Sequence, residues 1–187
     1  EMPQNKRFYV KYKKYSSEDI EYWGRYGITE NTLQAYGVRN VMMLQSVNSE
    51  GKNFEIASTY RDPMYAYTFD DGKGVKIYRP FSKLRFVQYG NIQRPYVFGD
   101  KNLPDIGTYV FITGGEKDVM TLASHGFSAI CYNSDTAKIP EETLTKLSLQ
   151  FMYTILLYDA DETGKRESLA RQEEMKGRFN LYRLVLP

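Results

Sequence analysis

The stretches Tyr109-Val-Phe-Ile-Thr-Gly-Gly115 and Thr154-Ile-Leu-Leu-Tyr-Asp-Ala-Asp161 decide the fold of this chain. Each begins with a short run of β-branched, aliphatic and aromatic residues without polar alternation, which is typical of a strand buried on both faces of a parallel sheet. Each run is followed by a polar turn and then by a helical pattern. Strands that alternate with helices through right-handed crossovers predict a Rossmann-like parallel sheet with helices on both faces.

Acidic residues follow the carboxyl ends of both predicted strands. Glu116 and Asp118 come just after the first strand, and Asp159 and Asp161 end the second stretch. Ligands of open α/β sheets bind at this edge. Converging carboxylates repel one another unless a cation lies between them, and Mg²⁺ takes one or two carboxylates together with water and substrate phosphates. The pattern favours Mg²⁺ or Mn²⁺ held by Asp159 and Asp161, and the alternative is ordinary turn formation by Asp and Gly.

The amino-terminal half has a different pattern and predicts a small mixed α+β lobe over residues 1–100. Two short helices are expected between residues 17 and 36. Prolines and glycines between residues 91 and 106 indicate a linker to a second domain at 101–187. The strands expected in the first lobe form an antiparallel meander with a hairpin at 70–74: Val38–Val47, Phe54–Thr59, Met64–Phe69, Val75–Tyr78 and Leu84–Tyr89.

Cations and aromatic residues are interspersed in the last strands of this lobe. With a period of two, Lys83 and Arg85 share one face of the expected strand, opposite Leu84 and Phe86. A basic face opposite an apolar one fits a sheet that presents charge to a phosphate backbone, and solvated strand cations are the alternative. The residues expected to contact nucleic acid or nucleotide are Lys76, Arg79, Lys83, Arg85, Lys117 and Lys165.

Composition narrows the class of protein. The 187 residues are 42% hydrophobic with a net charge of +2, which indicates a globular protein without a global basic field. One Cys and one His exclude a Cys-rich zinc ribbon within this chain. No apolar run approaches the length of a membrane span and no signal-peptide pattern is present, so a cytoplasmic protein without a membrane partner is expected.

Two motifs carry a resemblance to a known family. Gly114-Gly-Glu-Lys-Asp-Val-Met120 and Asp159-Ala-Asp-Glu-Thr-Gly164 resemble the two motifs of the toprim domain, and residues 1–100 resemble the subdomain that precedes it in bacterial and phage primases and primase-helicases. The resemblance implies metal-dependent nucleotidyl transfer that makes RNA primers from nucleoside triphosphates on single-stranded DNA. It also implies zinc-ribbon and helicase domains outside this chain, a toprim domain truncated at its carboxyl end, and an origin in a phage or mobile element.

One position departs from the family pattern. The toprim motif reads Glu-Gly-x-x-Asp, and Gly114 occupies the place of the leading glutamate, which is the family's proposed general acid/base. Glu116, with Asp118, is the catalytic candidate that compensates for this loss. The alternative is that Glu116 is an ordinary solvated residue in the first helical turn, where the helix dipole favours an acid. A toprim module that has lost catalysis and binds DNA within a replicative helicase is therefore the second functional hypothesis.

Overall fold

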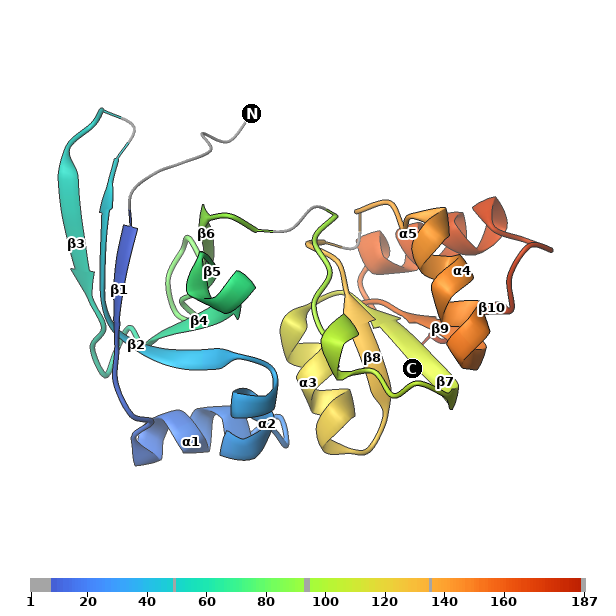
Figure 1. Cartoon of the computed structure of the whole chain (residues 1–187), viewed down its shortest axis with the longest axis horizontal. Coiled ribbons are helices and arrows are strands. Elements are labelled where there is room, and N and C mark those ends of the chain that lie inside the picture. Colours follow the sequence, from blue (N-terminus) through green and yellow to red (C-terminus); the bar gives the residue numbers. More distant parts are fainter. Residues whose placement is uncertain (1–7, 49, 93–94, 135, 186–187) are drawn as a thin grey trace. The chain divides into compact units, whose positions relative to one another are not determined.

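The computed structural model describes residues 8–48, 50–92, 95–134 and 136–185. Contacts within the chain divide it into two compact units: Glu1–Arg25 with Thr29–Gln93, and Tyr26–Ile28 with Arg94–Pro187. The first unit is built on an antiparallel sheet and the second on a parallel one (Figure 1). The α/β class expected from the sequence is therefore confirmed.

The sheet of the first unit has the strand order β1-β2-β4-β5-β6, with β3 also paired to β2. The expected meander is confirmed for β4, β5 and β6, which pair in chain order, but β4 pairs with β2 and not with β3. The reason is that β2 is long enough to pair with two strands along one edge. Residues 38–41 of β2 pair with β4 and residues 43–47 pair with β3. The strands are β1 (Phe8–Tyr12), β2 (Val38–Val47), β3 (Asn53–Ala57), β4 (Met64–Phe69), β5 (Gly74–Tyr78) and β6 (Phe86–Gly90), and the 3₁₀ turn η1 (Asp70–Gly72) closes the expected hairpin.

The first unit also contains the helices α1 (Ser17–Gly24) and α2 (Glu30–Ala35). The buried carboxylate of Asp19 attaches α1 to the sheet. Asp19 closes a capping box with Ser16, which satisfies backbone N–H groups at the start of α1. The same carboxylate accepts hydrogen bonds from the Asn40 side chain of β2 at 2.6 Å and from the Tyr65 hydroxyl of β4 at 2.8 Å. The single Trp23 packs edge-on against Tyr65 and is fully buried. Polar and aromatic contacts thus fix α1 on the sheet.

The second unit confirms the Rossmann-like prediction. Its parallel sheet has the order β10-β9-β7-β8. Helix α3 packs on β7 and β8, and it lies on one side of the sheet while α4 and α5 lie on the other (Figure 1). The elements are η2 (Asp100–Asn102), β7 (Gly107–Thr113), α3 (Glu116–Ser124), β8 (Ser128–Cys131), α4 (Glu141–Gln150), β9 (Phe151–Leu157), α5 (Glu162–Glu174) and β10 (Leu181–Arg183).

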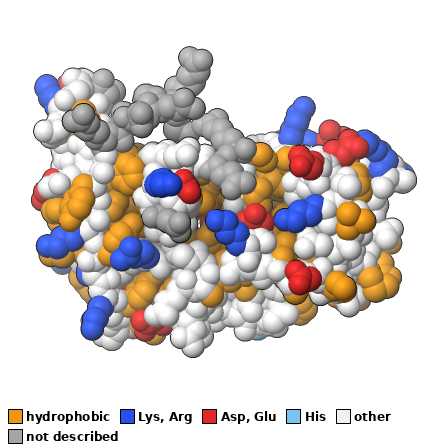
Figure 2. Space-filling model, in the orientation of Figure 1, with side chains coloured by type: hydrophobic (Ala, Val, Ile, Leu, Met, Phe, Trp, Pro, Cys, Tyr) orange, Lys and Arg blue, Asp and Glu red, His pale blue; other side chains and the backbone are white. Residues whose placement is uncertain are grey.

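The surface carries mixed charge. On the face shown in Figure 2, Lys and Arg side chains are dispersed among hydrophobic and acidic ones, in agreement with the net charge of +2. Within the described ranges, none of the helices combines the length and the apolar character needed to cross a lipid bilayer.

Candidate functional site

The candidate site lies where β7 and β9 end side by side. The two strands are neighbours in the parallel sheet, with Thr113 opposite Leu157 at their carboxyl ends. The loop after β7 leads through Gly115 into α3, and the loop after β9 leads through Asp159 into α5. Both loops leave the same edge of the sheet. They therefore place Asp118 of α3 close enough to Asp159, which follows β9, for the two charges to interact.

Asp118 is the strongly perturbed acid of the site. Burial is the main cause that raises the pKa of its carboxyl from 3.8 to about 6, and the negative charge of Asp159 raises it further. The Lys117 ammonium lowers this pKa, Glu116 raises it, and the backbone N–H of Gly115 lowers it. The folded protein therefore confines a carboxylate beside another negative charge, which is the arrangement that a bound cation would stabilise.

Because the pKa of Asp118 is raised, replacing its carboxyl group should stabilise the folded protein at neutral pH but not at acidic pH. A carboxyl that titrates at about 6 when folded and at 3.8 when unfolded contributes stability below the lower value, and this contribution is lost as the pH rises through the higher one. We expect Asp118→Asn to be more stable than the wild type by roughly 1–3 kcal/mol at about pH 7.5, and to show no such gain near about pH 4. Thermal unfolding at both pH values measures the difference.

The matched control is Asp105→Asn, because Asp105 is an exposed carboxylate of the same unit. Its stability should follow the wild type at both pH values. Equal stability of Asp118→Asn and the wild type at the higher pH would contradict the assigned burial and repulsion.

Asp159 and Asp161 both lie in an exposed loop, and the Asp161 side chain also caps a helix from this loop. Its Oδ1 accepts the backbone N–H of Gly164 at 2.7 Å, and it is the N-cap of α5. A Cβ at position 164 would collide with the carbonyl oxygen of Asp159, so glycine permits the close approach of α5 to this loop. The spacing between the two aspartates and Gly164 is therefore explained by helix capping and packing as well as by the metal binding expected of the aspartates.

Glu116 is placed differently from both sequence-based expectations. It is 3% exposed, and its Oε1 accepts a hydrogen bond from the hydroxyl of Tyr96. Tyr96 is held nearby because Phe98 forms an antiparallel bridge with Cys131 of β8. The expectation of a solvated residue is wrong, since the side chain is buried under the segment that precedes β7. A buried, hydrogen-bonded carboxylate also fits a structural contact better than a proton-transfer group that must reach substrate.

The acidic residues of the site fit a hard divalent cation in part. Across the residues that the structure describes, no three His, Cys, Asp or Glu side chains form a group that could hold a metal ion. The mutual repulsion of Asp118 and Asp159 nevertheless marks a place where two carboxylates approach each other. Mg²⁺ needs only one or two carboxylates when water and substrate phosphates supply the other oxygens. The donor set thus suits a cation that binds together with a phosphate ligand.

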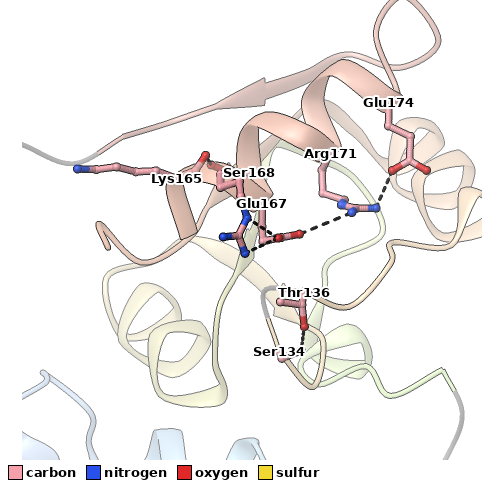
Figure 3. A network of polar contacts seen from close by, with 8 residues as sticks. Ser134, Thr136, Lys165, Glu167, Ser168, Arg171 and Glu174 are labelled. Atoms are coloured by element: carbon pink, nitrogen blue, oxygen red, sulfur yellow. Dashed lines mark hydrogen bonds and ion pairs between the residues drawn. The ribbon is translucent and has the colours of Figure 1, made fainter. Parts of the chain in front are cut away.

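The two cations expected near the site differ in their surroundings. The Lys117 ammonium lies 3.9 Å from the centroid of the Tyr26 ring. Lys165 belongs to the first turns of α5 and points away from the ion-pair network of Glu167, Arg171 and Glu174 (Figure 3). Its ammonium lies 4.0 Å from Glu162, at an exposed position where such a pair contributes little to stability.

Only part of the expected basic face in the first unit reaches the surface. Lys76 is 4% exposed, with its ammonium 4.6 Å from the Phe86 ring centroid, so its assignment as a surface contact is wrong. Arg79 is ion-paired with Asp62. Lys83 and Arg85 are exposed.

The expected separation of basic and apolar faces is also wrong. Leu84 is 62% exposed, as the cations beside it are exposed. The reason is that β6 begins only at Phe86, so residues 83–85 lie in the preceding turn, where the alternation of a paired strand does not apply.

Tyr26 and Tyr96 are the residues near the site that sequence reasoning missed. Each contacts the first turn of α3, through Lys117 and Glu116 respectively. Neither lies within a motif or a periodic pattern of the site, since Tyr26 is far from α3 in the sequence and Tyr96 precedes β7. The unusual abundance of tyrosine, 17 residues, was the one signal available, and it does not distinguish these two from the rest.

The fold is that of primase catalytic cores. The primase fragment of the bacteriophage T7 primase-helicase matches with a TM-score of 0.63 and 20% identity, over 88% of this chain and 63% of that one. The DnaG primase catalytic domain bound to single-stranded DNA matches with a TM-score of 0.65 and 13% identity, over 91% of this chain and 66% of that one. The Aquifex aeolicus primase, with zinc-binding and RNA polymerase domains, matches with a TM-score of 0.61 and 15% identity, over 92% and 50%.

The chain therefore spans about two thirds or less of these solved relatives. No protein-family model matches it. No curated protein matches it in sequence.

Proposed function

We propose that this chain is the catalytic core of a DNA primase or primase-helicase, which joins ribonucleotides into primers on single-stranded DNA in a metal-dependent reaction. The observation that carries the proposal is the pair Asp118 and Asp159, brought together at the carboxyl edge of the parallel sheet in a fold shared with primase cores. The chain would bind template DNA and nucleoside triphosphates. The helicase and zinc-ribbon functions would belong to other domains.

Each part of the site would have a distinct task. Asp159 and Asp118 would hold Mg²⁺ or Mn²⁺, with Asp161 contributing the carboxylate oxygen that α5 does not use. When bound, the metal supplies neutralisation of phosphate charge and a lowered pKa of the attacking hydroxyl. Glu116 would add negative charge to the site from its buried position, and the exposed Lys83 and Arg85 would contact the template backbone.

A second candidate function is favoured by a specific observation. Gly114 stands where the resemblance places the general acid/base, and Glu116, the nearest possible substitute, is buried against Tyr96. A chain in this state would bind metal or DNA within a larger replication protein without making primers. The two functions share a fold and differ in whether the strand-end carboxylates take part in chemistry.

Restoring the glutamate discriminates between the two candidates. Gly114→Glu returns the glutamate of the family pattern to the position that the resemblance assigns to it. If the site is otherwise intact, Gly114→Glu should raise primer synthesis by about 10²-fold, the usual contribution of a positioned general acid or base. Incorporation of labelled ribonucleotides on a single-stranded template, with Mg²⁺ or Mn²⁺, measures the change in the chain and in any longer protein that contains it.

Gly24→Glu is the matched control, because a side chain at position 24 meets open space and adds the same charge far along the chain. It should leave primer synthesis unchanged. Absence of primers from both the wild type and Gly114→Glu, with metal and DNA binding retained, would overturn the catalytic proposal in favour of the second candidate.

A further inference from the structure

The side chain of Lys117 is held by an aromatic ring from a distant segment of the chain. Its ammonium lies 3.9 Å from the centroid of Tyr26, within the range of a cation–π interaction. Lys117 is in the first turn of α3, between Glu116 and Asp118, and its charge acts on the Asp118 carboxyl. A cation is therefore fixed at the acidic edge of the sheet.

Tyr26 is itself fixed by packing along α3. The segment Tyr26–Ile28 groups with the second unit, and Ile28 is 1% exposed. Gly27 has a φ of 71°, and a Cβ there would lie 3.0 Å from Cε1 of His125. His125 follows the end of α3, and its Nδ1 hydrogen-bonds with the carbonyl oxygen of Thr121 at 2.8 Å. The turn thus makes contact at both ends of α3, which leaves the Tyr26 ring a defined position.

A held lysine differs in function from a free surface lysine. A lysine side chain has several rotatable bonds, and ordering it on binding opposes affinity. Contact with the Tyr26 ring orders the side chain before any ligand arrives. One ring occupies one side of an ammonium that has three N–H donors, so donors remain for oxygen ligands. Phosphate oxygens are the ligands that an ammonium beside a carboxylate-bound divalent cation would meet.

Resting on the proposed nucleotidyl-transfer function, we propose that Tyr26 is a positioning residue that holds Lys117 to contact the phosphates of the incoming nucleoside triphosphate. Lys117 binds the nucleotide, and Tyr26 acts only through Lys117. The phenol hydroxyl has no part in this role, because the face of the ring holds the ammonium. Phenylalanine at position 26 should therefore replace tyrosine, whereas leucine should not.

Binding of Mg·ATP, measured by calorimetry, tests the role of each residue. Tyr26→Leu and Lys117→Met should each weaken binding by roughly 5- to 10-fold, while Tyr26→Phe stays within about 2-fold of the wild type. The double variant should bind no more weakly than Lys117→Met alone, since Tyr26 acts through the lysine. In primer synthesis, the same variants should raise KM for the nucleotide and leave kcat nearly unchanged. Lys146→Met, at an exposed lysine of α4, is the control and should match the wild type.

A structural readout accompanies the affinities. In the protein with ¹³C-dimethylated lysines, the Lys117 methyl resonance should show a ring-current shift that persists in Tyr26→Phe and disappears in Tyr26→Leu. Thermal unfolding of each variant verifies that it folds. Unchanged Mg·ATP affinity in Lys117→Met would overturn the inference, as would additive effects of Tyr26→Leu and Lys117→Met.

The failure of this inference is distinguishable from failure of the proposed function. Wild-type protein that binds Mg·ATP, loses it in Asp159→Asn and retains it in Lys117→Met would overturn only the roles of Lys117 and Tyr26. Wild-type protein that binds no Mg·ATP at millimolar concentration would overturn the proposed function together with this inference.

Discussion

On the proposed function, Asp159→Asn should remove divalent-cation binding and reduce primer synthesis by about 10²-fold or more, since the bound metal would supply the charge stabilisation at the reacting phosphates. Asp159 is exposed at the strand end, and its charge is the main electrostatic cause of the raised Asp118 pKa. The substitution removes one of two neighbouring carboxylates while it keeps the size of the side chain. Calorimetric titration with Mn²⁺ and Mg²⁺, with and without nucleotide, measures the binding.

Asp161→Asn separates metal binding from helix capping. Asparagine retains an oxygen that can accept the Gly164 N–H, so α5 should remain capped and the unfolding temperature should stay near the wild-type value. Metal affinity should fall if the second carboxylate oxygen is a ligand. Asp105→Asn should change neither property. Absence of metal binding by the wild type up to millimolar concentration, with nucleotide present, would remove the basis of the catalytic proposal.

The second large effect concerns the stability of the first unit. Asp19→Ala should lower its free energy of unfolding by about 3–5 kcal/mol, because the substitution removes the acceptor of three hydrogen bonds, two of which are buried. The donors are the Ser16 backbone N–H at 2.9 Å, the Asn40 amide at 2.6 Å and the Tyr65 hydroxyl at 2.8 Å. For a unit of this size, such a loss corresponds to a decrease of about 12–40 °C in the unfolding temperature.

Trp23 reports this transition directly. It is the single tryptophan of the chain, it is fully buried, and its ring lies 5.0 Å from that of Tyr65. Denaturant unfolding followed by Trp23 fluorescence therefore measures the first unit. Glu18→Ala is the control: its side chain is exposed in the same helical turn, and its unfolding curve should overlay that of the wild type. Equal stability of Asp19→Ala and the wild type would contradict the bonding described here.

Several features of the fold could be predicted from the sequence because they depend on local patterns. The apolar runs before Gly114 and before Asp159 lack alternation, and only a strand covered on both faces buries them completely. The crossover rule then brings the carboxyl ends of these strands to one edge, which is why Asp118 and Asp159 meet as expected. The hairpin between β4 and β5 was likewise evident from its Asp and Gly residues.

The sequence-based predictions were wrong where a strand edge can pair with more than one strand, or where a long side chain can lie either at the surface or inside the unit. The ten residues of β2 pair with β3 and β4 along the same edge, and strand periodicity alone does not distinguish this from a meander. Lys76 lies within a run that reads as basic and aromatic, yet its stem and ammonium pack against Phe86 inside the unit. Long cationic side chains bury their stems readily, so charge alone does not place a lysine at the surface.

The sequence by itself determined the order of strands and helices, the parallel sheet and the position of the acidic loops at its carboxyl edge, because periodicity and chain connectivity dictate these. The tertiary structure decided the surroundings of the charged side chains at this edge: Tyr96 covers Glu116, and Tyr26 holds Lys117 beside Asp118. These contacts join residues far apart in the chain, and their energies depend on burial and on distances that exist only after the strands and helices have packed.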